Sequence, residues 1–263
     1  MVKYRNLVND FDIQLIMPPQ YAFEKIKFAT DPATFEKAVK LYEEKKVVDF
    51  MEEYGDYVAV VHGTKPYKVS VSGRHYDRGT CECYMGQNNY LCKHMVAVAI
   101  RACLNGEKIA EEEKEIIGAP VCSGRLGELG QEELSNIKKI ITEAMKYIKS
   151  YNGSSRIWFA YQDSLSEGRA RLSAAVSKLP VSEQTARILI DLLLRLDKKL
   201  RTGGIDDSDG VVGDFIQEAV VVLREFVKLC PSCVKSFKKL CGQSTCFDWE
   251  EPLVKLFDDD SIH

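Results

Sequence analysis

The chain has 263 residues, of which 45% are hydrophobic and 29% charged, and its formal net charge is −3. This composition is ordinary for a folded globular protein of one or two domains, and it excludes a polycation. No apolar run comes near the roughly eighteen residues that a membrane-spanning helix needs, so we expect no membrane contact. The stretch from Met1 to Phe11 is polar and lacks the apolar core of a secretory signal. We therefore expect an intracellular, cytoplasmic protein whose nine cysteines are thiols or metal ligands rather than disulfides.

The N-terminal part of the sequence begins with two local signals. Asp12 to Met17 has the residue types of a short strand, which the prolines that follow would end. Asp31 and Pro32 are typical of an N-cap and of the first position of a helix. Apolar residues then recur with helical spacing, and we place this helix at about 32–45.

A different pattern follows, in which short segments rich in Val, Tyr and Phe alternate with turn sequences. We expect these segments to be strands of a small antiparallel sheet: Lys46–Met51, Tyr57–His62, Tyr67–Val71 and, as the last strand, Thr80–Cys83. An apolar helix from His94 to Leu104 completes this part. The fold class we predict for residues 1–105 is therefore α+β.

The rest of the chain lacks strand patterns. Residues 106–130 contain an acidic run and three closely spaced glycines, and we interpret them as a linker. From 131 to 263 the apolar spacing predicts an all-α bundle or solenoid-like domain. We expect its helices near 131–150, 156–178, 182–200, 208–229, 231–241 and 248–257.

The most informative motif is a pair of closely spaced metal-ligand doublets. Cys81 and Cys83 are separated by one residue, and after eight intervening residues Cys92 and His94 repeat that spacing. Three thiolates and one imidazole are a ligand set that holds a structural Zn²⁺ with tetrahedral geometry. Because the protein supplies all four ligands, the metal has no open position, which favours a folded binding module over metal catalysis.

The spacing also predicts where the ligands lie. Cys81 and Cys83 would face the same side of a strand, since side chains two apart in a strand share one face. Residues two apart on a helix differ by about 200°. We therefore expect Cys92 just before a helix and His94 in its first turn, where the orphan N–H groups favour thiolate charge.

Two alternatives to a zinc site stay open for these residues. The cysteines can be small buried core residues beside an unrelated histidine, or Cys81 and Cys83 can form a redox dithiol, although the thioredoxin-type spacing is Cys-x-x-Cys. His62 and His75 are near enough in sequence to replace a ligand. We interpret both as strand or surface histidines.

The motif Cys81-x-Cys83, then Cys92-x-His94, resembles the SWIM zinc finger, whose pattern is C-x-C-x(n)-C-x-H. Tyr67-Lys-Val-Ser-Val71 before it and the apolar helix after it extend the similarity to about residues 22–104, and it resembles the prokaryotic members of that family. The resemblance implies a ββα-like zinc module with a role in DNA binding or protein–protein contact. The C-terminal half is also similar to the helical region of bacterial SWIM proteins, for which the resemblance implies no activity.

Two further clusters lie in the C-terminal half. Asp206-Asp207-Ser208-Asp209-Gly210 lacks the alternating acids and the final Glu of an EF-hand loop. It is better interpreted as a helix start, with Ser208 or Asp207 as the cap and Asp209 favoured by the helix dipole. The sequence also contains four cysteines with the spacing of a second zinc site, although buried helix cysteines explain them better: Cys230, Cys233, Cys241 and Cys246.

A possible contact surface surrounds the predicted finger. Exposed tyrosines can stack on bases while cations meet phosphates, and residues 56–105 have a net charge of +3, whereas the segments on either side are negative. That surplus is smaller than the basic footprint of a dedicated DNA-binding domain. The candidate nucleic-acid-binding residues are Arg74, Arg78, Tyr84, Tyr90, Lys93 and Arg101.

We therefore expect a non-enzymatic zinc-binding protein that contacts DNA or a DNA-processing protein. The alternative is a protein–protein adaptor with no nucleic-acid contact, using the helical domain as a partner surface. An enzyme is disfavoured because neither a phosphate loop nor a Ser/His/Asp arrangement occurs in the sequence.

Overall fold

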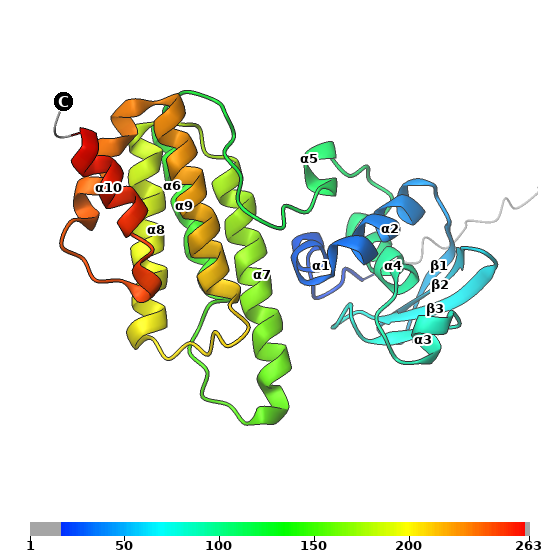
Figure 1. Ribbon diagram of the computed structural model, residues 1–263. Helices are drawn as coiled ribbons and strands as arrows, with labels where there is room; N and C mark the ends of the chain where they lie inside the picture. Colours follow the sequence, from blue (N-terminus) through cyan, green and yellow to red (C-terminus); the bar gives the residue numbers. More distant parts are fainter. Residues whose placement is uncertain (1–16, 261–263) are drawn as a thin grey trace, which may run out of the picture. The chain divides into compact units, whose positions relative to one another are not determined.

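The computed structural model describes residues 17–260, and these form two compact units, one ending at Ala110 and the other beginning at Glu111 (Figure 1). The predicted α+β class is confirmed, with a small sheet in the first unit and helices alone in the second. Within the described range, none of the helices combines the length and apolar character needed to cross a membrane.

The first unit contains a four-stranded antiparallel sheet with the strands in chain order: β1 (Val47–Glu53), β2 (Asp56–His62), β3 (Pro66–Ser72) and β4 (Gly79–Cys81). Burial alternates along β2 and β3, so that Tyr57, Ala59 and Val61 face the core beside Val69 and Val71. This alternation is the period-two pattern of a sheet with one covered face. The predicted strands, β4 included, are confirmed to within two residues at each end.

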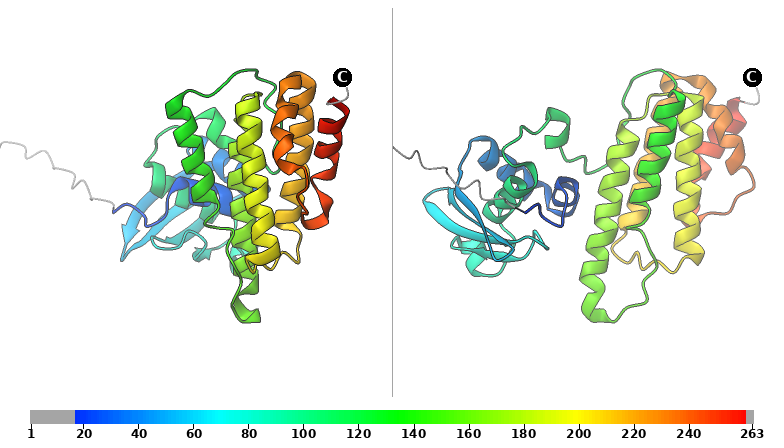
Figure 2. Two further views of the ribbon diagram at one scale, coloured as in Figure 1. Left: turned by 90° about the vertical axis from the view of Figure 1, so that its left-hand side faces the viewer. Right: turned by 180° about the vertical axis from the view of Figure 1, so that it is seen from behind.

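Helices cover only one face of this sheet (Figures 1 and 2). α4 (Lys93–Leu104) packs directly on the strands, and α1 (Phe23–Ala29) and α2 (Pro32–Glu43) pack on α4. Side chains of α4 are buried almost all round because the helix lies between these two layers. The predicted cap of α2 is confirmed, since the Asp31 carboxylate accepts a 2.9 Å hydrogen bond from the Thr34 N–H.

Three features of this unit differ from the sequence prediction or lie beyond it. The strand expected at Asp12–Met17 falls almost wholly outside the described residues. Helix α1 has no counterpart among the predicted elements, because its seven residues carry no side-chain cap and only about two turns of periodicity. The last strand ends at Cys81 rather than Cys83, and Cys83 instead caps the short helix α3 (Tyr84–Gln87).

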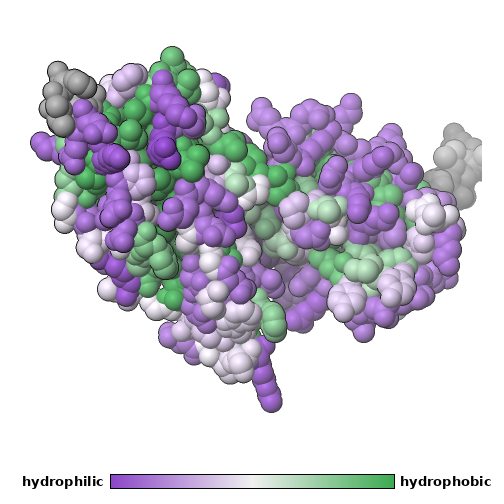
Figure 3. Space-filling view, viewed as in Figure 1, coloured by the Kyte–Doolittle hydropathy of each residue, from purple (hydrophilic) through white to green (hydrophobic). Residues whose placement is uncertain are grey.

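The second unit is a helical bundle with one continuous apolar core (Figures 1 and 2). Its elements are α5 (Glu111–Lys114), α6 (Gln131–Ala144), η1 (Ser155–Ile157), α7 (Trp158–Ser177), α8 (Glu183–Thr202), α9 (Val211–Leu229), η2 (Pro231–Leu240), η3 (Cys246–Asp248) and α10 (Glu251–Asp260). Each predicted helix has a counterpart, but the segment at 231–240 is a 3₁₀ helix and α6 ends six residues early. In Figure 3, hydrophilic side chains cover much of the visible surface, and apolar ones are seen between these helices.

The predicted linker contains ordered structure. Residues 111–114 form α5, and residues 121–130 are hydrogen-bonded to the end of α7 and to the segment between α7 and α8. The Val121 N–H donates to Ser177 Oγ at 3.0 Å, and the Ser123 hydroxyl donates to the Leu179 carbonyl at 2.6 Å. The second half of the expected linker is therefore part of the helical unit.

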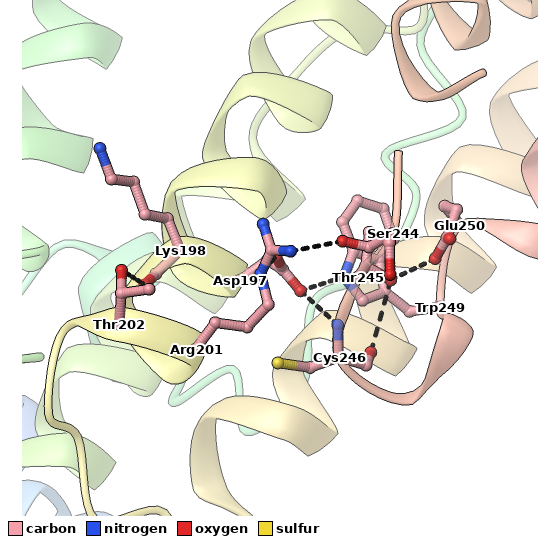
Figure 4. Close-up of polar contacts among 9 residues, drawn as sticks. All are labelled: Asp197, Lys198, Arg201, Thr202, Ser244, Thr245, Cys246, Trp249 and Glu250. Atoms are coloured by element: carbon pink, nitrogen blue, oxygen red, sulfur yellow. Dashed lines mark hydrogen bonds and ion pairs between the residues drawn. The ribbon is translucent and has the colours of Figure 1, made fainter. Parts of the chain in front are cut away.

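A buried carboxylate fixes the C-terminal part of the bundle (Figure 4). Asp197 on α8 accepts from the Cys246 N–H at 2.7 Å and from Trp249 Nε1 at 3.2 Å. Its other oxygen lies 2.9 Å from Arg201 Nε. These contacts hold a turn in which Phe247 and Asp248 both have positive φ, a strained conformation for non-glycine residues.

Candidate metal centre

The four predicted ligands come from three neighbouring elements of the first unit. Cys81 ends β4, Cys83 is the N-cap of α3, Cys92 is the N-cap of α4, and His94 is in the first turn of α4. The sheet and α4 pack against each other, so the end of β4 and the start of α4 are brought together. Residues separated by up to thirteen positions thus meet at one point.

The ligand atoms of these four residues all lie within 4.8 Å of one another. The imidazole Nδ1 of His94 is 3.7 Å from Cys81 Sγ and 3.9 Å from Cys92 Sγ. Zinc bonds of about 2.3 Å to sulfur and 2.0–2.1 Å to nitrogen in a tetrahedron put ligand atoms roughly 3.6–3.8 Å apart. The four side chains are each between 4% and 7% exposed. Their geometry and donor types therefore fit one buried Zn²⁺.

The prediction for the second doublet is confirmed, and the prediction for the first is wrong in one detail. Cys92 lies just before α4 with His94 inside it, as expected. Cys83, however, does not continue the strand, because the chain turns after Cys81 into α3. A Cβ on Gly86 would come within 2.5 Å of the Cys81 backbone and side chain, so this turn requires glycine. Cys83 reaches the same point as Cys81 by this turn rather than by strand alternation.

The environment of Cys92 favours the thiolate that a metal needs. The pKa of Cys92 is lowered, chiefly because the Cys81 thiol donates a hydrogen bond to its sulfur. Burial opposes this effect, and hydrogen bonds from His94 and the Met95 N–H add to it. The pKa of Cys81 is raised by the same hydrogen bond and by burial. The Gly86 N–H, 3.4 Å from Cys83 Sγ, donates to the third sulfur. Backbone donors at the starts of α3 and α4 thus support negative charge at this centre.

A Zn²⁺ bound here would cross-link β4, α3 and α4, and it would supply folding energy rather than a reactive water, because four protein ligands complete its shell. The two remaining histidines near the motif, His62 and His75, are exposed and are not part of the cluster.

The second set of cysteines does not assemble into a site. Among residues 17–260, the one group that has ligand atoms suited to a metal is the cluster at Cys81. Cys233 is fully buried in the core of the bundle, whereas Cys241 is exposed. The core interpretation therefore holds for Cys233, and the four residues do not converge.

The acidic cluster is a helix cap, as its sequence indicated. Ser208 and Asp207 were the two predicted caps, and Asp207 is the one that caps the helix. Its carboxylate accepts hydrogen bonds from the Val212 N–H at 2.8 Å and the Gly213 N–H at 2.9 Å, at the start of α9. Asp206 instead joins this loop to α7 by accepting from Trp158 Nε1 at 3.0 Å. The cluster connects helices and does not gather ligand atoms.

The candidate contact residues are only partly together. Tyr84 on α3 and Tyr90 before α4 belong to the loop between Cys83 and Cys92, and they are 80% and 62% exposed. We call this loop, residues 84–91, the zinc knuckle. Lys93, separated from the knuckle by Cys92, is half-buried. Both tyrosine rings are therefore free to contact a partner close to the metal centre.

The three arginines have different positions. Arg74 and Arg78 are exposed on the loop between β3 and β4. Arg101 is near the far end of α4, about 12 Å along the helix from Lys93. Its guanidinium lies 5.2 Å from the Phe50 ring centroid and donates to Asn105 at 3.2 Å. Arg101 therefore packs away from the zinc knuckle.

A shallow groove of about 310 Å³ was not anticipated from the sequence. It lies on the uncovered face of the sheet, beside the knuckle, and is lined by Val58, Lys68, Val69, Ser70, Thr80, Cys81, Glu82 and Gln87. The polar residues at alternate positions of β3 and β4 were the available signal, since they mark the face that no helix covers.

Comparison with known proteins agrees with this geometry. Residues 67–103 match the family model described as the SWIM zinc finger, a range that includes all four ligands. No curated protein and no solved structure gives a match to the chain.

Proposed function

We propose that this chain, which contains a SWIM zinc finger at residues 67–103, is a non-enzymatic binding module that contacts single-stranded nucleic acid through its zinc knuckle. One observation carries the proposal. The four ligands are buried and close the metal shell, while Tyr84 and Tyr90 on the loop that the metal would hold are largely exposed. The metal thus supports a surface instead of a reaction.

The exposed tyrosines are suited to bases that are not paired. Each ring can stack on a base, which contributes about 1–3 kcal/mol per base and is tolerant of sequence. Arg74, Arg78 and Lys93 lie on the segments that flank the knuckle in sequence and can meet phosphates. With roughly three phosphate contacts, the logarithm of the affinity should fall with the logarithm of salt concentration with a slope of about −2. Moderate, salt-sensitive affinity is what this charge supports.

A protein partner is the second candidate, and one observation favours it. Met85, in the same knuckle, is 45% exposed between the two tyrosines in sequence. Tyr, Met and Arg are enriched in protein–protein interfaces. In this alternative the knuckle, or the helical unit, binds a DNA-processing protein or another partner without touching nucleic acid.

We also place the protein in a reducing, intracellular compartment such as the cytoplasm. Three thiolates must stay reduced to hold a metal, and disulfide-forming compartments oppose this.

The test is fluorescence anisotropy of the zinc-loaded full chain with labelled single- and double-stranded DNA at about 50 and 200 mM salt. Tyr84→Ala combined with Tyr90→Ala should weaken single-strand binding at least about tenfold, since two stacking contacts are removed. Phe159→Ala is the matched control, because this aromatic residue is 75% exposed on the helical unit.

Binding of the single strand that the tyrosine variant loses and the control keeps would support the proposal. Absence of DNA binding at the lower salt concentration would remove it and leave the adaptor role.

A further inference from the structure

The turn between β2 and β3 packs against the metal ligand His94. This turn, Gly63 to Lys65, joins strands far from the ligand in sequence. Tyr67 nevertheless packs on the imidazole, and a Cβ on Gly63 would reach it. His94 is 4% exposed. The ring is thus enclosed on one side by the sulfurs and on the other by this hairpin.

Gly63 lies against the edge of the ring that is turned away from the sulfurs. A Cβ at this position would be 3.0 Å from His94 Nε2 and 3.0 Å from Tyr67 Cε2. Such a separation is closer than ordinary contact, so the imidazole or the tyrosine ring would have to shift. The backbone of Gly63 does not have positive φ, so alanine would add only this steric effect.

Tyr67 covers one side of the imidazole. The two ring centroids are 4.7 Å apart with an interplanar angle of 33°. The tyrosine is itself held by the turn, since its hydroxyl lies 3.2 Å from Thr64 Oγ1. An aromatic pair at this separation favours one orientation of both rings.

The orientation of His94 decides whether it can bind metal. Nδ1 faces the sulfurs of Cys81 and Cys92. Rotation of the ring by about 180° would present a carbon atom to them instead. Metal-binding histidines are commonly held in place by a hydrogen bond from the other nitrogen. Here Nε2 is buried and has no hydrogen-bond partner among the described residues.

We propose that Gly63 and Tyr67 are positioning residues of the metal centre, and that their packing does what a hydrogen bond to Nε2 does elsewhere. The β2–β3 hairpin is then a structural part of the zinc site, although it contributes no ligand. This inference concerns metal binding alone and does not depend on what the knuckle contacts.

The experiment compares Gly63→Ala, Tyr67→Ala and Tyr67→Phe in the full chain, with Gly118→Ala as control. A Cβ on Gly118 would meet nothing within 4 Å. Zinc affinity is measured by competition with a chromophoric chelator, and the ligand field by the visible absorption of Co²⁺ at saturation. Gly63→Ala and Tyr67→Ala should lower zinc affinity about 10–100-fold, as loss of an outer support does. Both should also change the Co²⁺ spectrum, while Tyr67→Phe and the control stay near wild type.

Wild-type zinc affinity in both alanine variants would overturn the proposal. So would reduced affinity with an unchanged Co²⁺ spectrum, which would indicate a general loss of stability. Should Gly63→Ala fail to fold at saturating metal, the comparison of Tyr67→Ala with Tyr67→Phe decides, because phenylalanine keeps the ring contact.

Discussion

Removal of the metal should unfold the zinc knuckle while leaving the helical unit intact. The knuckle is residues 84–91, and its helix α3 buries none of its residues. Its polar contacts are local. The backbone N–H groups of Gln87, Asn88, Asn89 and Tyr90 donate to carbonyls of Cys83, Met85 and Gly86 at 2.9–3.1 Å. The Gln87 amide donates to the Glu82 carbonyl at 3.1 Å and the Asn88 amide to the Tyr84 carbonyl at 2.7 Å. The knuckle thus has almost no apolar contribution of its own.

The free energies involved indicate that these contacts alone do not keep the knuckle folded. Fixing the backbone of the eight residues between Cys83 and Cys92 costs about 1–2 kcal/mol each, or roughly 8–16 kcal/mol. Hydrogen bonds contribute about 1 kcal/mol apiece. Structural zinc contributes about 10–16 kcal/mol at neutral pH, which is of the size needed to offset the ordering of this loop.

The assay is amide hydrogen exchange by mass spectrometry, with and without a zinc chelator. Peptides covering residues 82–92 should lose protection on chelation. Peptides from α7 and α8 should be unchanged, because the core of the helical unit has its own apolar cluster. Protection of the knuckle that persists after complete removal of zinc would refute this reasoning.

Two substitutions test the helical unit. Asp197→Ala should lower the free energy of unfolding of the helical unit by about 3–5 kcal/mol, because Arg201, the Cys246 N–H and Trp249 Nε1 lose a buried partner. Chemical denaturation measures this free energy, and a loss under about 1 kcal/mol would contradict the importance of the buried network. Asp207→Ala should lower the free energy of unfolding by about 0.5–2 kcal/mol, since the start of α9 loses both of its side-chain acceptors. A thermal midpoint equal to that of wild type would show that the cap does not contribute to stability.

Local signals in the sequence predict much of this structure. Asp31 with Pro32 locates the start of α2, and the spacing of the four ligands locates the metal centre, because caps and ligand doublets depend on a few adjacent residues. The path of the backbone between the ligands is harder to predict from the sequence. Nothing local shows that Gly86 must approach Cys81, so the turn that takes Cys83 out of the strand is not predictable from the motif.

Contacts between distant segments are not predictable in this way. Gly63 and His94 are thirty-one residues apart in sequence, and their proximity depends on how α4 packs across β2 and β3. Arg101 is a candidate contact residue by its type and its position in the sequence. Its contact with Phe50 follows from the pairing of helix and sheet, which periodicity alone does not specify.

The most direct test of a zinc centre in this protein is the zinc content of the purified chain, measured by native mass spectrometry and elemental analysis. We predict one Zn²⁺ per chain, lost in Cys81→Ser and retained in Cys241→Ser, whose cysteine is exposed and outside the cluster. A wild-type chain without zinc after expression in zinc-supplemented medium would contradict this prediction. So would a Cys81→Ser, Cys92→Ser double variant that keeps a full equivalent of zinc.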